Sequence, residues 1–271
     1  MTRPDRFHSS FARARDARRG NLLPYVTSGY PDLETSSEII ARAAGLGATV
    51  IEVGIPYSDS IADGPVIQQS FHAALERGLR LRDTFEMIAR IRSRVECALV
   101  AMVSYSLVHR VGRDVFLREA AGAGFDGVIF PDLPLEESAA AIASAESVNL
   151  RYIGLVAPTS SPERRERIAR TSTGFVYQIA VAGTTGERGA LPATLKDDVA
   201  SLRRSTTLPV CVGFGIATAE QVRQVCDVAD GAIVGSAIVR RVAESVNRGD
   251  SPSRVVDSAA AFIGELMRGT S

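Results

Sequence analysis

Eight short apolar segments recur along the chain, and almost every one is followed by a segment with the apolar spacing of a helix. The predicted strands are residues 22–27, 49–53, 99–103, 127–130, 152–156, 175–180, 209–212 and 232–234. Continuous runs of Val, Ile and Leu are typical of parallel strands that are buried on both faces. Eight strand–helix units therefore predict an α/β fold, a closed (β/α)8 TIM barrel rather than an open, doubly wound sheet.

The length of the chain fits one such barrel. Single α/β barrels typically have about 250 residues, and no low-complexity linker divides this sequence, so we expect residues 1–271 to form a single domain. Phe7 and Phe11 in the basic opening segment have the spacing of a short amphipathic helix, which we expect as an extra N-terminal helix; an organellar transit peptide is the alternative. No glycine-rich dinucleotide fingerprint follows the first strand, which argues against a Rossmann fold.

Charge and cysteine usage restrict the possible partners. The 31 Lys and Arg residues balance the 31 Asp and Glu residues, so we expect neither a nucleic-acid nor a membrane-surface partner. No apolar run approaches the ~20 residues that span a bilayer. Cys97, Cys211 and Cys226 are odd in number and irregularly spaced, and none has a His at metal-ligand spacing. This pattern favours buried thiols in a reducing, cytoplasmic location and no bound metal.

Residues 49–65 carry the strongest indication of chemistry. Glu52 stands near the carboxyl end of a short β-branched strand, and the polar, Gly- and Pro-rich loop that follows it carries Asp59 and Asp63. In a barrel enzyme the loops at the carboxyl ends of the strands form the active face. The alternative is that these acids only cap or turn the chain, as loop Asp residues commonly do.

Other strand ends would bring further groups to the same face. The polar side chains expected there are Tyr25, Glu52, Asp63, Tyr105, Asp132 and Tyr177. Glycine-bearing loops follow the last three strands, at residues 183–186, 213–215 and 235–236. Such loops frequently bind phosphate through backbone N–H groups and a helix N-terminus. The sequence therefore predicts a phosphorylated substrate, unless these glycines only turn the chain.

The sequence lacks the residues that several aldolase and isomerase mechanisms would need. A Schiff-base enzyme needs a lysine at a strand end, but Lys196, the only lysine, has the setting of a solvated helix residue. A metal-dependent aldolase needs clustered His and acid ligands, and the histidines, His8, His72 and His109, are scattered. Sugar-phosphate isomerases of the barrel type would need acids at the ends of strands 1 and 5, which are absent. General acid–base work by paired carboxylates remains.

The motifs at these strand ends resemble those of the tryptophan synthase alpha subunit family. They are PYVT at 24–27, IEVGIPYSD at 51–59, ADGPVIQ at 62–68, PDLP at 131–134, GTTG at 183–186, GFGI at 213–216 and GSAI at 235–238. The motifs occur in the family's order and span nearly the whole chain. The resemblance implies retro-aldol cleavage of indole-3-glycerol phosphate to indole and glyceraldehyde 3-phosphate, without a cofactor on this chain.

The resemblance also implies a role for each site residue. Glu52 would be the general acid–base on the indole C3 atom and the side-chain hydroxyl, and Asp63 would accept the indole N–H. Tyr25 and Tyr177 would line the indole pocket, and Thr185 would close over the substrate and touch Asp63. The phosphate would be held by Gly186, Gly213, Phe214, Gly215, Gly235 and Ser236.

Three positions depart from the family pattern. Ser104 replaces a residue that helps to wall the indole pocket, and Ser60 and Ser106 replace residues that face the pyridoxal-phosphate-bearing β subunit in the family. The resemblance implies an α2β2 heterotetramer, which these departures weaken. Three interpretations stay open: an ordinary α subunit after neutral drift, a stand-alone lyase that releases free indole, and a slow subunit that mainly activates a diverged β partner.

Overall fold

One parallel sheet organises the computed structural model, which describes residues 5–60, 63–180, 192–213 and 215–271. Within these residues the sheet has nine strands in the order β5-β4-β3-β2-β1-β9-β8-β7-β6. The strands are β1 (Asn21–Thr27), β2 (Val50–Gly54), β3 (Ala98–Met102), β4 (Gly127–Ile129), β5 (Arg151–Tyr152), β6 (Gly154–Val156), β7 (Val176–Ile179), β8 (Val210–Gly213) and β9 (Gly231–Val234). Every predicted strand is found, with ends that differ by a few residues at most.

The fifth predicted strand closes the ring. It is interrupted at Ile153, so that β5 and β6 are two halves of the segment predicted as one strand. The first half pairs with β4 and the second half pairs with β7. The two edge strands of the sheet, β5 and β6, thus belong to one continuous segment. Counted as one strand, they close the sheet into an eight-stranded barrel, as predicted.

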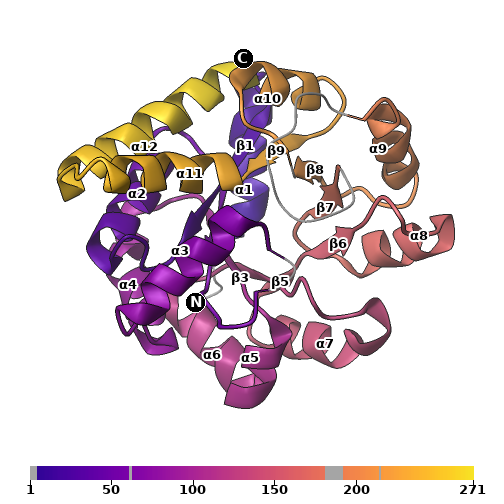
Figure 1. The fold of residues 1–271 in the computed structure, drawn as a ribbon. Coiled ribbons are helices and arrows are strands. Elements are labelled where there is room, and N and C mark those ends of the chain that lie inside the picture. Colours follow the sequence, from indigo (N-terminus) through magenta and orange to yellow (C-terminus); the bar gives the residue numbers. More distant parts are fainter. Residues whose placement is uncertain (1–4, 61–62, 181–191, 214) are drawn as a thin grey trace.

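The helices surround the strands: most of them form an outer ring, and α1 lies across one end of the barrel (Figure 1). They are α1 (Arg6–Asp16), α2 (Leu33–Gly45), α3 (Pro65–Glu76), α4 (Leu81–Ile91), α5 (Tyr105–Val111), α6 (Arg113–Ala123), α7 (Ala139–Ser147), α8 (Pro162–Thr171), α9 (Leu195–Arg203), α10 (Ala219–Cys226), α11 (Ser236–Asn247) and α12 (Pro252–Met267), with short 3-10 turns η1 (Arg92–Arg94), η2 (Leu135–Glu137) and η3 (Arg268–Thr270). No helix in the described part of the chain is long and apolar enough to cross a membrane.

Local sequence explains many of the helix ends. Ser161 and Ser251 each accept a hydrogen bond from a first-turn N–H, and a proline follows each of them at the first helical position. Gly124 ends α6 in the left-handed conformation, which costs glycine little. The short helix α5 was not predicted from the sequence, and the turn η2 precedes α7.

Side chains inside the barrel alternate with those that face the helices. Leu23, Val50, Val100, Ile153 and Phe175 belong to one buried cluster inside the barrel, whereas their sequence neighbours pack in a larger cluster beneath the helices. Tyr25 and Glu52 have the same parity as Leu23 and Val50 on their strands, so their side chains also point inward. This alternation places polar groups at the carboxyl-end mouth of an otherwise apolar interior.

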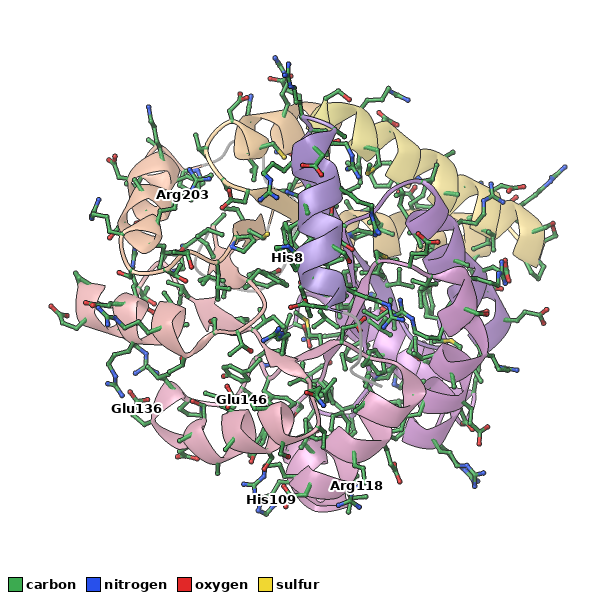
Figure 2. The ribbon with its side chains drawn as sticks, turned by 180° about the vertical axis from the view of Figure 1, so that it is seen from behind. His8, His109, Arg118, Glu136, Glu146 and Arg203 are labelled. Carbon is green, nitrogen blue, oxygen red and sulfur yellow. The ribbon has the colours of Figure 1, made fainter. Side chains whose placement is uncertain are left out.

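The extra helix α1 closes the opposite mouth of the barrel, and Figure 2 shows it lying across the back of the molecule. The Phe7 ring packs against Phe175, with 6.3 Å between the ring centroids. Arg6 and Arg92 both pair with the buried carboxylate of Asp126, at 3.1 and 3.2 Å. The predicted N-terminal helix is therefore confirmed, and it serves as a plug.

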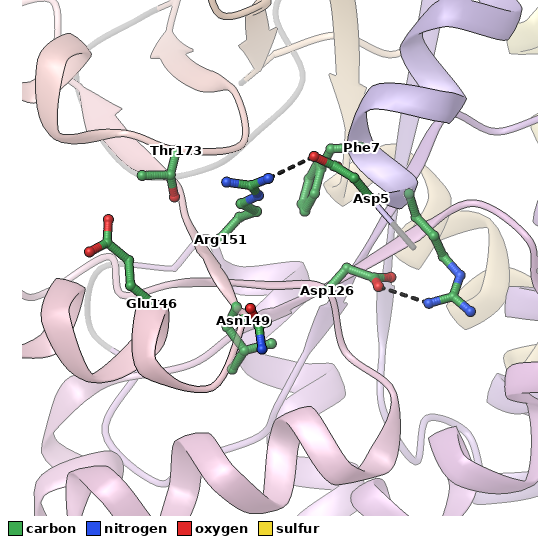
Figure 3. Close-up of a pocket in the computed structure, with 9 residues that line it drawn as sticks. Asp5, Phe7, Asp126, Glu146, Asn149, Arg151 and Thr173 are labelled. Atoms are coloured by element: carbon green, nitrogen blue, oxygen red, sulfur yellow. Dashed lines mark hydrogen bonds and ion pairs between the residues drawn. The ribbon is translucent and has the colours of Figure 1, made fainter. Parts of the chain in front are cut away.

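A small pocket of about 270 Å³ lies beside this plug (Figure 3). Its rim is polar, and Arg151 pairs with Asp5 across it at 2.6 Å. The Asp126 carboxylate also accepts a hydrogen bond from the backbone N–H of Leu99, at 2.9 Å. These charges are used to hold α1 on the barrel, at the end far from the carboxyl ends of the strands.

Candidate active site

Glu52 is a buried carboxyl at the mouth of the barrel. It lies on β2 between Tyr25 of β1 and Val100 of β3, and it is 1% exposed. Its Oε1 atom has no hydrogen-bond partner among the residues that the structure describes. Burial raises the pKa of Glu52 to about 8, because leaving water penalises the charged form. A carboxyl with this pKa can both give and take a proton near neutral pH.

Two buried tyrosines flank this carboxyl. The Tyr25 hydroxyl lies against Gly54, where an added Cβ would come within 1.8 Å of it, and the Tyr177 hydroxyl lies against Gly213 in the same way, at 2.4 Å. Burial raises the pKa of both phenols, and the negative charges of Asp63 and Glu52 raise them further. Both tyrosines therefore stay neutral beside Glu52.

Asp63 lies in the loop between β2 and α3, and its carboxylate is held by a residue that sequence reasoning missed. Tyr57 donates a hydrogen bond from its hydroxyl to Asp63 Oδ2 at 3.0 Å. The pKa of Asp63 is raised, mainly by burial and also by the nearby charge of Asp132, while the Tyr57 hydrogen bond opposes the shift. Tyr57 stood in the motif at 51–59, but only the folded loop shows its contact.

Ser104 has a defined role in the structure. It is 2% exposed, and it caps the start of α5. Its hydroxyl donates to Asp132 Oδ2 at 2.6 Å, while the backbone N–H of Tyr105 donates to Asp132 Oδ1 at 2.7 Å. The serine therefore fixes a carboxylate at the end of β4. Sequence reasoning placed Asp132 on the active face without giving it a role.

The described glycine loops stand at the ends of the neighbouring strands β8 and β9. Gly213 ends β8 and pairs with Ile233 of β9. Gly215 has a φ of +84°, which glycine adopts without strain, and Gly235 and Ser236 open the long helix α11. The N-terminus of a helix favours an anion through its dipole and its free N–H groups. Thr185, Gly186 and Phe214 lie outside the described residues.

The two serines expected on a partner-facing surface differ in burial. Ser106 is exposed at the start of α5. Ser60 is only 8% exposed, and its carbonyl oxygen accepts from the Asp63 N–H at 3.0 Å and from Gln68 Nε2 at 3.0 Å. Ser60 therefore shapes the loop that carries Asp63 and has little exposed surface of its own.

The lysine and one of the histidines that other aldolase chemistries would need are exposed on helices. Lys196 is exposed in the first turn of α9, as predicted for a solvated helix residue. His72 pairs with Glu76 on the exposed side of α3, at 3.0 Å. Across the described residues, no group of three or more His, Cys, Asp or Glu side chains could hold a metal ion.

Comparisons with known proteins point to one family. The family model described as tryptophan synthase alpha chain matches residues 11–270. The tryptophan synthase alpha chain of Rhodopirellula baltica is 44% identical over 246 residues, which cover 90% of this chain and 88% of the relative. That of Chloroflexus aggregans is 40% identical over 267 residues, 98% of both chains.

Solved structures give the same result. A chain of Mycobacterium tuberculosis tryptophan synthase superposes with a TM-score of 0.88 at 35% identity, covering 99% of each chain. The tryptophan synthase alpha subunit of Legionella pneumophila superposes with a TM-score of 0.88 at 30% identity, covering 98% of each chain. The chain therefore belongs to the tryptophan synthase alpha chain family.

Proposed function

We propose that Glu52 and Asp63 perform the family's lyase reaction in this chain, the cleavage of indole-3-glycerol phosphate to indole and glyceraldehyde 3-phosphate. The protonated Glu52 carboxyl gives its proton to the indole C3 atom, which turns the ring into an electron sink. The resulting Glu52 carboxylate then takes the proton of the side-chain hydroxyl. The bond between C3 and the hydroxyl-bearing carbon breaks, its electron pair returns to the ring, and the aldehyde leaves.

The observation that carries this proposal is the state of Glu52. Among the described residues the buried Glu52 Oε1 atom has no hydrogen-bond partner, and burial raises the pKa of this carboxyl to about 8, so both its acid and its base form are accessible near neutral pH. The first step needs the acid form and the second needs the base form, so one group with a near-neutral pKa suits both steps.

Asp63 supports the same reaction from the other side of the ring. When C3 is protonated, positive charge develops on the indole nitrogen, and a carboxylate that accepts the N–H stabilises that charge. Tyr25, Tyr177 and Ser104 would form the walls around the ring, and Thr185 would close over it. Two of these walls, Tyr25 and Tyr177, are close enough to Asp63 for its charge to raise the pKa values of their phenols.

The phosphate would bind at the ends of β8 and β9. Gly213, Gly215, Gly235 and Ser236 offer backbone N–H groups and a hydroxyl at the start of α11. We assign Gly186 and Phe214 to the same cradle from the motif alone. The phosphate and the indole ring would thus span the barrel mouth, with the bond that breaks beside Glu52.

The family works with a β subunit, and we propose an α2β2 heterotetramer with a pyridoxal-phosphate-dependent β subunit for this chain. Exposed Ser106 would lie on that interface, whereas buried Ser60 would affect it only through the loop of Asp63. Residues 1–271 would act as one barrel domain, and the odd number of free cysteines favours a cytoplasmic location.

The first test is indole release from indole-3-glycerol phosphate by the purified chain, alone and with a tryptophan synthase β subunit. We expect slow release that rises by about 5- to 150-fold with the β subunit, because coupling between such sites is typically worth about 1–3 kcal/mol. Fast release that ignores the β subunit would instead identify a stand-alone lyase.

The variant Glu52→Gln separates catalysis from partner activation. General acid–base groups typically contribute about 10²–10⁴-fold, so the variant should lose at least a hundredfold in indole release. Its activation of the β subunit should be largely unchanged. A Glu52→Gln protein that cleaves at the wild-type rate would contradict the assigned mechanism.

A further inference from the structure

The Asp63 carboxylate is oriented by a side chain from its own loop. We propose that Tyr57 is a positioning residue for the cleavage reaction: its hydroxyl holds Asp63 in the orientation that accepts the indole N–H. This inference rests on the proposed role of Asp63. Tyr57 would act through Asp63 and need not touch the substrate.

Tyr57 is itself held in place from α3. Its ring packs edge-on against Phe71, with 5.4 Å between the ring centroids and 61° between the planes. Phe71 is buried in a small apolar cluster with Tyr25, Ile67 and Val239, and Tyr57 packs against that cluster. A half-buried ring with a fixed neighbour presents its hydroxyl in one direction, which a mobile surface tyrosine would not do.

The backbone of Asp63 is held as well. Its N–H donates to the carbonyl oxygen of Ser60 at 3.0 Å, and its own carbonyl oxygen accepts from Gln68 Nε2 at 2.8 Å. With the main chain fixed, the carboxylate can still rotate about its side-chain bonds. Within the described part of the chain, the Tyr57 hydroxyl is the donor that bonds this carboxylate, at Oδ2. It therefore selects one rotation and leaves Oδ1 for a ligand.

The other groups that act on Asp63 do not replace this contact. Asp132, in the loop after β4, places a like charge near it, and Tyr25 of β1 and Tyr177 of β7 also face it electrostatically. Tyr57 is the group that favours the ionised form of Asp63, through its hydrogen bond. Removing one hydroxyl should thus loosen the carboxylate and weaken it as an acceptor.

The test measures recognition of the N–H itself. Two phosphate esters that cannot be cleaved are titrated calorimetrically: 3-(indol-3-yl)propyl phosphate and its 1-benzothiophene counterpart, in which sulfur replaces the N–H. The proteins are the wild type, Tyr57→Phe, Asp63→Ala, and the matched control Tyr30→Phe. Tyr30 is also half-buried and packs beside the same cluster, so its variant loses a comparable hydroxyl.

We expect the wild type to prefer the indole ligand, and Tyr57→Phe to reduce that preference about tenfold, because the carboxylate that accepts the N–H is no longer held in one orientation. Tyr30→Phe should keep the preference. Equal weakening of both ligands by Tyr57→Phe would show a merely structural role and overturn the proposal, as would an unchanged preference. If Asp63→Ala keeps the wild-type preference, the assignment of Asp63 itself fails, which is a distinct result.

Discussion

At the scale of single residues, the burial of Glu52, the proposed acid–base group, imposes a cost on the fold. Its carboxyl has an ordinary pKa of about 4.5 and a folded-state pKa of about 8. Between these values the unfolded chain releases the proton and the folded chain keeps it. The folded state then binds more protons than the unfolded state, so stability falls as pH rises through this range.

This proton balance gives a prediction for stability. Relative to Glu52→Gln, which cannot titrate, the wild type should lose free energy of unfolding steadily as pH rises from about 5 to about 8, by about 1.4 kcal/mol for each pH unit at most. Urea denaturation of both proteins at several pH values measures the difference. Parallel stabilities across this range would mean that Glu52 is ionised in the folded protein.

At the scale of elements, the plug helix α1 contributes to the stability of the barrel and lies at the end opposite the candidate active site. Phe7 is buried at the amino-terminal mouth, whereas the site residues lie at the carboxyl-terminal mouth. Phe7 contacts Phe175, and the ion pair between Arg6 and Asp126 holds the start of α1 beside it. Because the two mouths are separate, a substitution in α1 should weaken the barrel and leave the activity of the folded protein nearly unchanged.

We therefore expect Phe7→Ala to lower the free energy of unfolding by about 3–5 kcal/mol, as for other buried Phe truncations. The rate of indole release by the remaining folded protein should stay within about twofold of the wild type. Thermal denaturation and steady-state kinetics measure the two effects, with Phe11→Ala, a partly buried neighbour on the same helix, as the comparison. A large kinetic loss without unfolding would contradict the division between the mouths.

At the scale of the whole molecule, closure of the sheet links the two halves of the site. Glu52 is carried by β2 and the loops proposed to bind phosphate follow β8 and β9, and β1 joins them by pairing with both β2 and β9. A ligand that spans the mouth therefore binds only the closed barrel and stabilises all of it.

The same reasoning predicts a thermal shift. Glycerol 3-phosphate, which carries only the phosphate half of the substrate, should stabilise the barrel by about 2.7 kcal/mol at a hundred times its Kd. For a chain of this size the melting temperature would rise by about 5–10 °C. Glycerol at the same concentration is the control without the phosphate. Equal shifts in melting temperature with both compounds would contradict a phosphate site at the barrel mouth.

The sequence by itself determined the barrel and the principal acids. Continuous apolar runs mark buried parallel strands locally, so all eight predicted strands are present, and strand ends alone place Glu52, Tyr25 and Tyr177 at one mouth. The split of the fifth strand at Ile153, the short helix α5 and the burial of Ser60 were not predictable in this way. The split of the strand depends on its pairing with β4 and β7. The start of α5 depends on the contact between Ser104 and Asp132, and the burial of Ser60 depends on the folded loop.

Only the tertiary structure decided how the acids are held. The pKa of Glu52 depends on the packing around it, because burial alone raises it. Tyr57 meets Asp63, and Ser104 meets Asp132, through side-chain hydrogen bonds that the spacing of the residues along the chain does not specify. The spacing of apolar residues along the chain indicates which face of a helix or strand is buried. The partners of a buried polar group are set by chain segments that come together only when the barrel closes.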